Sequence, residues 1–317
     1  MAEDEFAIIQ HYFRSIGADS KHCVLAIGDD AAVVEVPTGM QQVVCLDTLN
    51  GGIHFPLDTP PADIAYKALA VNLSDLAAMG ATPDWFQLSL SLPASDVEWL
   101  RCFAEGLQQC ASRYGAQLIG GDTCRGELSV SVQAAGLVPS NRFVTRAGGR
   151  PGDLVVVSGR LGDAGLGLAH LQGRIELPDA LAARCLAALN RPEPRLDLVA
   201  FLREFASAAI DLSDGLQGDL AHILEASGCG ARIERASLPV DPWIQRQDLY
   251  RYALSAGDDY EICCTVPAGN RDAVDEWNRA HPEGGLSVIG ELVDSGFYLR
   301  VDNAWHDLCA AGGYRHF

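Results

Sequence analysis

The sequence predicts an α+β fold in two halves. Helical and strand-like segments are interleaved along the 317 residues without the regular alternation of a doubly wound sheet. A stretch rich in glycine, proline and charge, RAGGRPGD at residues 146–153, interrupts the apolar periodicity near the middle of the chain. The chain is also too long for one ordinary core. We therefore expect an N-terminal domain over residues 1–145 and a C-terminal α+β domain over residues 146–317.

The first half begins with a predicted helix over residues 4–16, where Phe6, Ile9, Phe13 and Ile16 recur at helical spacing. A second, long helix opens at Pro60-Pro61, carries an acid in its first turn and has an Ala/Leu-rich body. The remaining predicted elements are strands near 24–27, 32–36, 43–47 and 85–92, a helix over 95–114, and strands at 117–119 and 128–138.

The second half repeats this mixture after the candidate linker. The predicted elements are a strand at 154–157, helices at 180–189 and 196–205, a strand into Ile210, a helix after Asp214, a strand at 260–266, a helix at 271–280 and late strands. Cys263 and Cys264 are adjacent within one of these strands, so their side chains should point to opposite faces.

Composition and charge exclude several classes of protein. The formal net charge of −19, with no run of Lys or Arg, makes a nucleic-acid partner unexpected. No basic region precedes an apolar run at the N-terminus, and no apolar stretch is long enough to span a bilayer, so we expect a cytoplasmic protein without a membrane partner. The ten cysteines show no C-x-x-C pair and are expected to be reduced, buried thiols rather than zinc ligands.

Acidic residues gather in six short motifs at predicted strand ends and helix starts. They are GDDAA (28–32), DT (47–48), NLSD (72–75), GGDT (120–123), DLSDG (211–215) and GDDYE (257–261). Each motif alone is explained by turn or helix-capping chemistry. Asp75 is harder to explain in this way, because it lies within an apolar helix, where an unpaired carboxylate costs several kcal/mol.

Several carboxylates in one place need cations with them. Two carboxylates 4 Å apart repel by about 4 kcal/mol at an effective dielectric constant of 20. Magnesium is the natural partner, because it prefers oxygen ligands and is commonly shared between carboxylates and phosphates. A calcium site of the contiguous loop type is not expected, because the chain has no D-x-[DN]-x-[DN]-G sequence.

Familiar nucleotide-binding and hydrolase signatures are missing. The sequence has no G-x-x-x-x-G-K-[ST] loop, no H-R-D catalytic loop, no G-x-S-x-G and no H-E-x-x-H. The stretch GRLGDAGLG at 159–167 either cradles phosphate or is a glycine-rich start of a helix, and the sequence leaves both open. An ATP site here would therefore be built in another way.

The acidic motifs and their neighbours resemble one family in order along essentially the whole chain. The strings are GDDAA (28–32), YKALAVNLSDLAAMGATP (66–83), LIGGDT (118–123), RAGGRPGD (146–153), DLSDGL (211–216) and GDDYEI (257–262). In combination they are similar to the thiamine-monophosphate kinase family, within the superfamily of aminoimidazole ribonucleotide synthetase.

The resemblance implies a two-domain fold like that of the synthetase, and a homodimer whose N-terminal sheets pair across the two-fold axis. It implies ATP-dependent phosphorylation of thiamine monophosphate to thiamine diphosphate by direct in-line phosphoryl transfer, using several Mg²⁺ ions and no general base. The implied metal ligands are Asp30, Cys45, Leu46, Asp47, Asp75, Asp122, Asp211 and Asp214. The implied ATP contacts are Tyr114, Gly121, Asp122, Arg146 and Ser213, and the implied substrate contacts are His54, Glu261 and Tyr314.

Two positions depart from the family pattern, and two other functions remain open. Cys45 stands where the family often has a hydroxyl residue, which would remove a hydroxyl ligand unless the contact is through the backbone. Asp258 shortens an acid that is commonly glutamate. The alternatives are another ATP-dependent enzyme of the same superfamily with a different acceptor, and a non-catalytic scaffold that binds magnesium and nucleotide.

Overall fold

The computed structural model describes residues 5–17, 19–282 and 284–308 of the chain. The chain divides into two compact units. The first comprises residues up to Ala77 together with Ala81–Phe143, and the second comprises Ala78–Gly80 and the chain from Val144 onward. The division falls between Phe143 and Val144, whereas the sequence analysis placed it between residues 145 and 146.

The first unit is a four-stranded sheet with helices. Its elements are α1 (Glu5–Ile8), the π-helical turn η1 (Ile9–Phe13), β1 (Cys23–Leu25), β2 (Val33–Val34), β3 (Met40–Asn50), α2 (Pro61–Ala78), β4 (Thr82–Leu92), α3 (Val97–Tyr114), β5 (Gln117–Arg125) and β6 (Ser129–Pro139). The sheet order is β3-β6-β4-β5, in which β4 and β5 are parallel and the other neighbours are antiparallel. Strands β1 and β2 form a separate pair.

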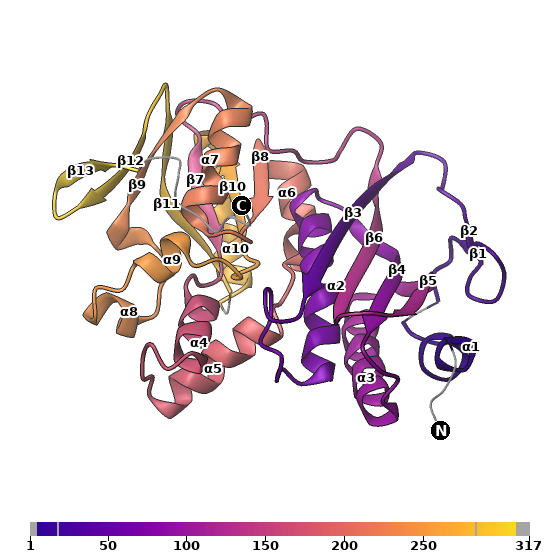
Figure 1. The fold of residues 1–317 in the computed structure, drawn as a ribbon. Coiled ribbons are helices and arrows are strands. Elements are labelled where there is room, and N and C mark those ends of the chain that lie inside the picture. The colour runs from indigo at the N-terminus through magenta and orange to yellow at the C-terminus, as the bar shows by residue number, and fades with distance from the viewer. Residues whose placement is uncertain (1–4, 18, 283, 309–317) are drawn as a thin grey trace. The chain divides into compact units, whose positions relative to one another are not determined.

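Strand register decides which side chains face the helices. Val132 of β6 lies opposite both Asp47 of β3 and Leu88 of β4, so these three residues share one face of the sheet. Helices α2 and α3 run along this sheet side by side (Figure 1). They pack so closely that a Cβ on Gly106 of α3 would lie 2.0 Å from the carbonyl oxygen of Ala62 at the start of α2.

The ends of α3 follow from local sequence. The Asp96 side chain accepts a hydrogen bond from the Trp99 amide, which caps the first turn of the helix. Gly115 ends the helix in the left-handed conformation, with a φ of 72°. The chain therefore turns directly into β5, which carries Gly121 and Asp122.

The second unit is a seven-stranded mixed sheet with helices. Its elements are β7 (Leu154–Ser158), α4 (Asp163–Leu171), α5 (Asp179–Asn190), η2 (Leu196–Leu198), α6 (Val199–Phe205), β8 (Ala208–Asp211), α7 (Leu216–Ser227), β9 (Gly230–Glu234), η3 (Arg235–Ser237), α8 (Pro242–Arg246), α9 (Arg251–Ser255), β10 (Ile262–Val266), η4 (Ala268–Asn270), α10 (Arg271–Ala280), β11 (Leu286–Val293), β12 (Phe297–Val301) and β13 (Ala304–Asp307). The sheet order is β13-β12-β9-β11-β7-β10-β8.

The central strands of this sheet are apolar on both faces. Every residue of β10 is buried, as is most of β7, which is typical of strands covered on both sides. Cys263 and Cys264 are both buried free thiols, in line with the prediction for this strand. The described cysteines are all free thiols.

Several predicted elements differ from the observed ones. The helix predicted over residues 4–16 is shorter and ends in a π-helical turn at Phe13. Strands β3 and β5 are longer than predicted because their polar ends, such as Asp122, still pair with neighbouring strands. Helices α8 and α9 and strand β9 were not predicted, since five-residue segments give almost no periodic signal.

Within the part of the chain that the structure describes, no helix combines the length and the apolar character required for a membrane span. The cytoplasmic location inferred from the sequence stays a prediction.

Candidate active site

Asp47 and Asp75 are two predicted metal ligands that come together in the first unit. Asp47 lies on the face of β3 that is turned toward the helices, and Asp75 lies one turn before the end of α2. Their carboxyl groups lie within hydrogen-bonding distance of each other. Residues far apart in sequence are thus joined into one carboxylate pair.

This pair is electrostatically unfavourable without a proton or a cation. Burial raises the pKa of the Asp47 carboxyl above its usual range, while the hydrogen bond with Asp75 and the charge of His54 act in the opposite direction. Two ionised carboxylates at such a distance repel each other strongly. The pair therefore suits a divalent cation with oxygen ligands.

Cys45 and His54 lie beside the pair. Cys45 shares the face of β3 with Asp47, and its thiol donates to the carbonyl oxygen of Asn72 on α2 at 3.3 Å. His54 follows β3 in a tight turn, where its Nδ1 accepts a hydrogen bond from the Asn50 amide at 2.9 Å. The side chain of Leu46, in contrast, is 64% exposed on the other face of the sheet, so only its backbone could serve as a ligand.

Asp30 and Asp122 line a cavity of about 1150 Å³ within the first unit. Its walls come from the turn η1, the segment 26–32 and the neighbouring strands β4 and β5. Gly121 belongs to the same wall, with a φ of 153° and no room for a side chain, because a Cβ would lie 1.8 Å from the Leu88 carbonyl oxygen. The cavity thus has carboxylates beside an apolar wall, a combination that suits a nucleotide with its metal-bound phosphates.

Polar contacts attach the start of the Asp30 segment to the sheet. The Ser20 hydroxyl donates to Asp84 Oδ1 at 2.5 Å, and His22 Nδ1 lies 3.1 Å from the same oxygen. The Ser20 amide donates to the Gln117 side chain at 2.8 Å. Apolar residues of the same segment pack on Trp85, so the segment that carries Asp30 is held against β4 and β5.

Three other residues predicted to contact ATP or the substrate are not among the described residues that line this cavity. Tyr114, at the end of α3, lies with its hydroxyl 3.4 Å from that of Tyr66, and it is not among the described residues that line the cavity. Arg146 belongs to the second unit and is exposed. Tyr314 falls outside the described residues. The roles predicted for these three residues stay predictions.

The two acidic motifs of the second unit lie side by side. Asp211, the last residue of β8, is paired with Ile262 of β10. The Asp258 amide donates to the Ser213 carbonyl at 2.9 Å, which joins the two loops directly. Asp258 and Tyr260 both have positive φ values, of 64° and 48°. Such strained backbone is typical of functional loops.

Asp219 is a buried acid that the sequence analysis missed. Its carboxylate accepts a hydrogen bond from the Asp214 amide at 3.0 Å, which orders the loop before α7. Burial and the neighbouring charge of Asp211 raise the pKa of Asp219 to about 8. Its position five residues after Asp214, in the first turn of a helix that follows DLSDG, was the available signal.

The glycine-rich stretch 159–167 forms the start of α4. Gly162 precedes the helix, and its amide donates to both carboxylate oxygens of Asp259 at 3.0 Å. A Cβ on Gly167 would lie 2.5 Å from the Cys185 carbonyl oxygen, so this glycine allows close packing of α4 on α5. The helix start that the sequence offered is thus observed, and the other possibility, that the stretch cradles phosphate, stays a prediction.

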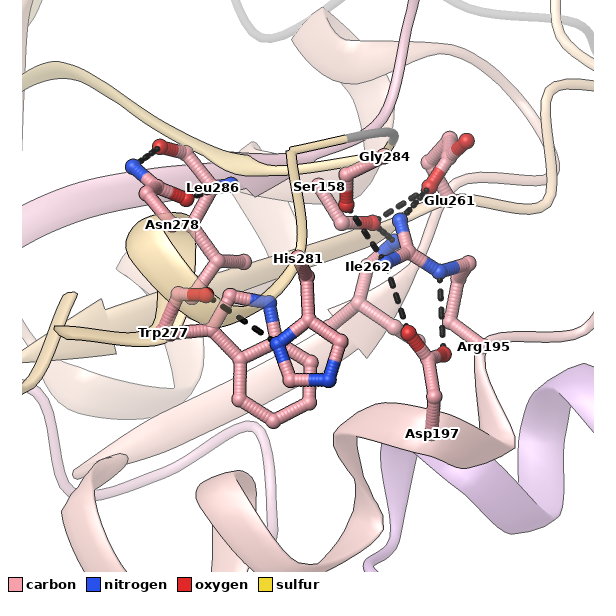
Figure 2. A network of polar contacts seen from close by, with 10 residues as sticks. All are labelled: Ser158, Arg195, Asp197, Glu261, Ile262, Trp277, Asn278, His281, Gly284 and Leu286. Atoms are coloured by element: carbon pink, nitrogen blue, oxygen red, sulfur yellow. Dashed lines mark hydrogen bonds and ion pairs between the residues drawn. The ribbon is translucent and has the colours of Figure 1, made fainter. Parts of the chain in front are cut away.

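Glu261 is held by a network that sequence reasoning also missed. Its Oε2 accepts hydrogen bonds from Arg195 at 2.8 Å and from the Ser158 hydroxyl at 2.5 Å, as Figure 2 shows. Arg195 is only 8% exposed. Its place in the sequence, in the segment RPEPRLD, gave no sign of these partners.

Comparison with known proteins shows the family to which the chain belongs. The model of the AIR synthase related protein family matches with its N-terminal domain at residues 28–138 and with its C-terminal domain at residues 150–302. The thiamine-monophosphate kinase of Escherichia coli K12 is 48% identical over 280 residues, which is 87% of this chain and 86% of the relative.

Solved structures of thiamine-monophosphate kinases are also similar to this chain. The crystal structure of thiamine-monophosphate kinase from Stenotrophomonas maltophilia superposes with a TM-score of 0.83 at 41% identity, over 90% of this chain and 93% of the other. AaThiL complexed with AMPPCP and TMP superposes with a TM-score of 0.77 at 31% identity, over 92% of each chain. The chain belongs to the AIR synthase related proteins and, within them, to the thiamine-monophosphate kinase family, whose members are phosphotransferases.

Proposed function

We propose that this chain transfers the γ-phosphoryl group of ATP to thiamine monophosphate, giving thiamine diphosphate and ADP. The observation that carries the proposal is the pair of contacting carboxylates, Asp47 and Asp75, in a chain that is 48% identical to a thiamine-monophosphate kinase. A solved relative complexed with AMPPCP and TMP supports both substrates.

The acidic residues fit magnesium. Asp30, Asp47, Asp75 and Asp122 would hold it in the first unit, and Asp211 and Asp214 in the second. Among the described residues, no three His, Cys, Asp or Glu side chains form a complete metal site by themselves. Water and phosphate oxygens would complete the coordination, as is usual for Mg²⁺. When bound, magnesium would offset the charge of the phosphates and align them for in-line transfer.

The remaining residues bind and orient the substrates. The acceptor is a phosphate monoester, largely dianionic near neutral pH because its second pKa is about 6, so no general base is needed. Arg146 is exposed and can form a charge-assisted hydrogen bond with a phosphate. Gly121 and Ser213 offer backbone close to the acids, and His54 and Glu261 contact the thiamine portion of the acceptor.

The test is an assay with ATP, Mg²⁺ and thiamine monophosphate, read by chromatography as thiamine diphosphate and ADP. We expect the two products in equal amounts, and none when EDTA removes the metal. Unphosphorylated thiamine as acceptor is the control, and it should give no thiamine diphosphate. A folded protein that binds ATP but forms no diphosphate would contradict the proposal.

We also propose that the chain is a homodimer that pairs through the open face of its N-terminal sheet. Val44 and Leu46 on this face of β3 are 49% and 64% exposed, which is unusual for large apolar residues of a sheet. Leu46→Arg should convert the dimer to a monomer, because it places a charge on the shared face. Light scattering after size-exclusion chromatography measures the mass.

A matched control is Leu171→Arg, which changes a 50% exposed leucine of α4 in the other unit. It should leave the mass unchanged. A wild-type protein that is monomeric at micromolar concentration, or a Leu46→Arg variant that remains dimeric, would refute this interface.

A further inference from the structure

Arg195 is a buried arginine that contacts three acceptors from separate parts of the second unit. Its Nε and Nη2 donate to Asp197 at 3.1 and 2.9 Å, and its Nη1 donates to Glu261 at 2.8 Å. Nη2 also donates to the Gly284 carbonyl at 2.7 Å. In Figure 2 the guanidinium lies between the carboxylates of Asp197 and Glu261. A lysine has its three donors on one nitrogen and no planar fork, so it cannot keep the paired contact of two nitrogens with Asp197 together with the contacts to Glu261 and Gly284.

Two donors fix the same oxygen of Glu261. Ser158 Oγ accepts a hydrogen bond from the Ile262 amide at 2.8 Å, so its single proton is directed to Glu261 Oε2. The Nη1 atom of Arg195 is the second donor to Glu261 Oε2. The carboxylate therefore has a defined orientation, set by Ser158 at the end of β7 and by Arg195 directly before η2.

The other oxygen of Glu261 is left for a ligand. Among the described residues, no hydrogen-bond donor reaches Oε1, and the Glu261 side chain keeps 18% of its surface exposed. Gly159 lies directly beside Oε1, because a Cβ at this position would lie 1.8 Å from that oxygen. A glycine is therefore needed at 159 for the carboxylate to keep its place.

The charge of the cluster indicates what this oxygen would bind. One guanidinium is shared by two carboxylates, so the cluster of Arg195, Asp197 and Glu261 has a net charge of −1. Such a site attracts a cation or an N–H donor and repels phosphate. In thiamine monophosphate the positive charge belongs to the thiazolium ring, which carries the phosphoethyl arm. The N–H donors belong to the aminopyrimidine ring, at the end opposite the phosphate.

We propose that Arg195 and Ser158 are positioning residues, which hold Glu261 so that its Oε1 accepts a hydrogen bond from the aminopyrimidine end of the acceptor substrate. The inference rests on the proposed function and adds residues that make no contact with the substrate themselves. It predicts that a substitution at Arg195 weakens the binding of thiamine monophosphate and leaves the binding of ATP unchanged.

The test is Arg195→Lys, with KM measured separately for thiamine monophosphate and ATP. We expect the KM for thiamine monophosphate to rise about tenfold, while kcat and the KM for ATP change by less than about twofold. In the Glu261→Gln background, Arg195→Lys should add less than about a twofold further increase, because the group that it positions is already altered. Ser158→Ala is a second variant, with an expected rise of about threefold in the same KM.

Arg184→Lys is the matched control. Arg184 also bridges two carboxylates of the second unit, those of Asp163 and Asp241, at 2.9 and 2.6 Å. This variant should lower Tm without changing either KM. Three results for Arg195→Lys would assign this residue a structural role and overturn the proposal. They are equal increases in both KM values, a loss of kcat alone, and an effect that adds fully to that of Glu261→Gln. A wild-type protein that forms no thiamine diphosphate would overturn the proposed function as well, so the two failures are distinguishable.

Discussion

Asp75→Asn should reduce kcat about a thousandfold or more while leaving the protein folded. Asparagine keeps the shape of the side chain but removes one of the two charges that make the Asp47–Asp75 pair suitable for a divalent cation. Charge stabilisation by a bound metal contributes several kcal/mol, and about 4 kcal/mol corresponds to roughly a thousandfold in rate. Steady-state kinetics and thermal unfolding measure the two expectations.

Asp63→Asn is the matched control for this variant. Asp63 lies in the first turn of the same helix, α2, where an acid interacts favourably with the helix dipole. Its replacement should lower stability by less than about 1 kcal/mol and leave kcat within about twofold. Near-normal turnover of the Asp75→Asn protein would exclude a role for this carboxylate in holding magnesium.

Gly121→Ala should destabilise the first unit by about 3 kcal/mol or more and abolish tight binding of ATP. The φ of 153° is one that other residues rarely adopt, and the new Cβ would lie 1.8 Å from the Leu88 carbonyl oxygen. Leu88 and Gly121 are paired across β4 and β5, so the strands would have to separate beside Asp122. Tm by calorimetry and the Kd for an ATP analogue test this expectation.

The control here is Gly115→Asn. Gly115 has a φ of 72° and open space around its Cα, and asparagine tolerates the left-handed conformation well. This variant should change Tm by no more than about 2 °C and keep the affinity for the analogue. If the Gly121→Ala protein matches the wild type in both measurements, the wall of the cavity is not as tightly packed as the structure indicates.

Elements with strong local signals were predictable from the sequence. Helix α2 begins at Pro61, the second residue of a Pro-Pro pair. Helix α3 lies between an N-cap at Asp96 and a glycine at 115, so the ends of both helices are encoded within a few residues. The same holds for the acidic motifs. Asp75 could be singled out because a charge inside an apolar helix needs a partner, and its partner is Asp47.

Contacts that depend on strand register were not predictable. The loops around Ser213 and Asp258 meet only because β8 and β10 pair with Asp211 opposite Ile262. Arg195 reaches Glu261, 66 residues further along the chain, through the same folded arrangement. No local pattern marks either contact, since each is formed by elements that are distant in sequence.

The sequence by itself determined the α+β class, the acidic motifs and the family that they resemble, because these depend on residue type and short spacing. The tertiary structure decided which acids meet within each unit. It paired Asp47 with Asp75, placed Asp30 and Asp122 on one cavity, and fixed Glu261 through Arg195 and Ser158. Helix packing and strand register bring these groups together, and both are properties of the folded chain.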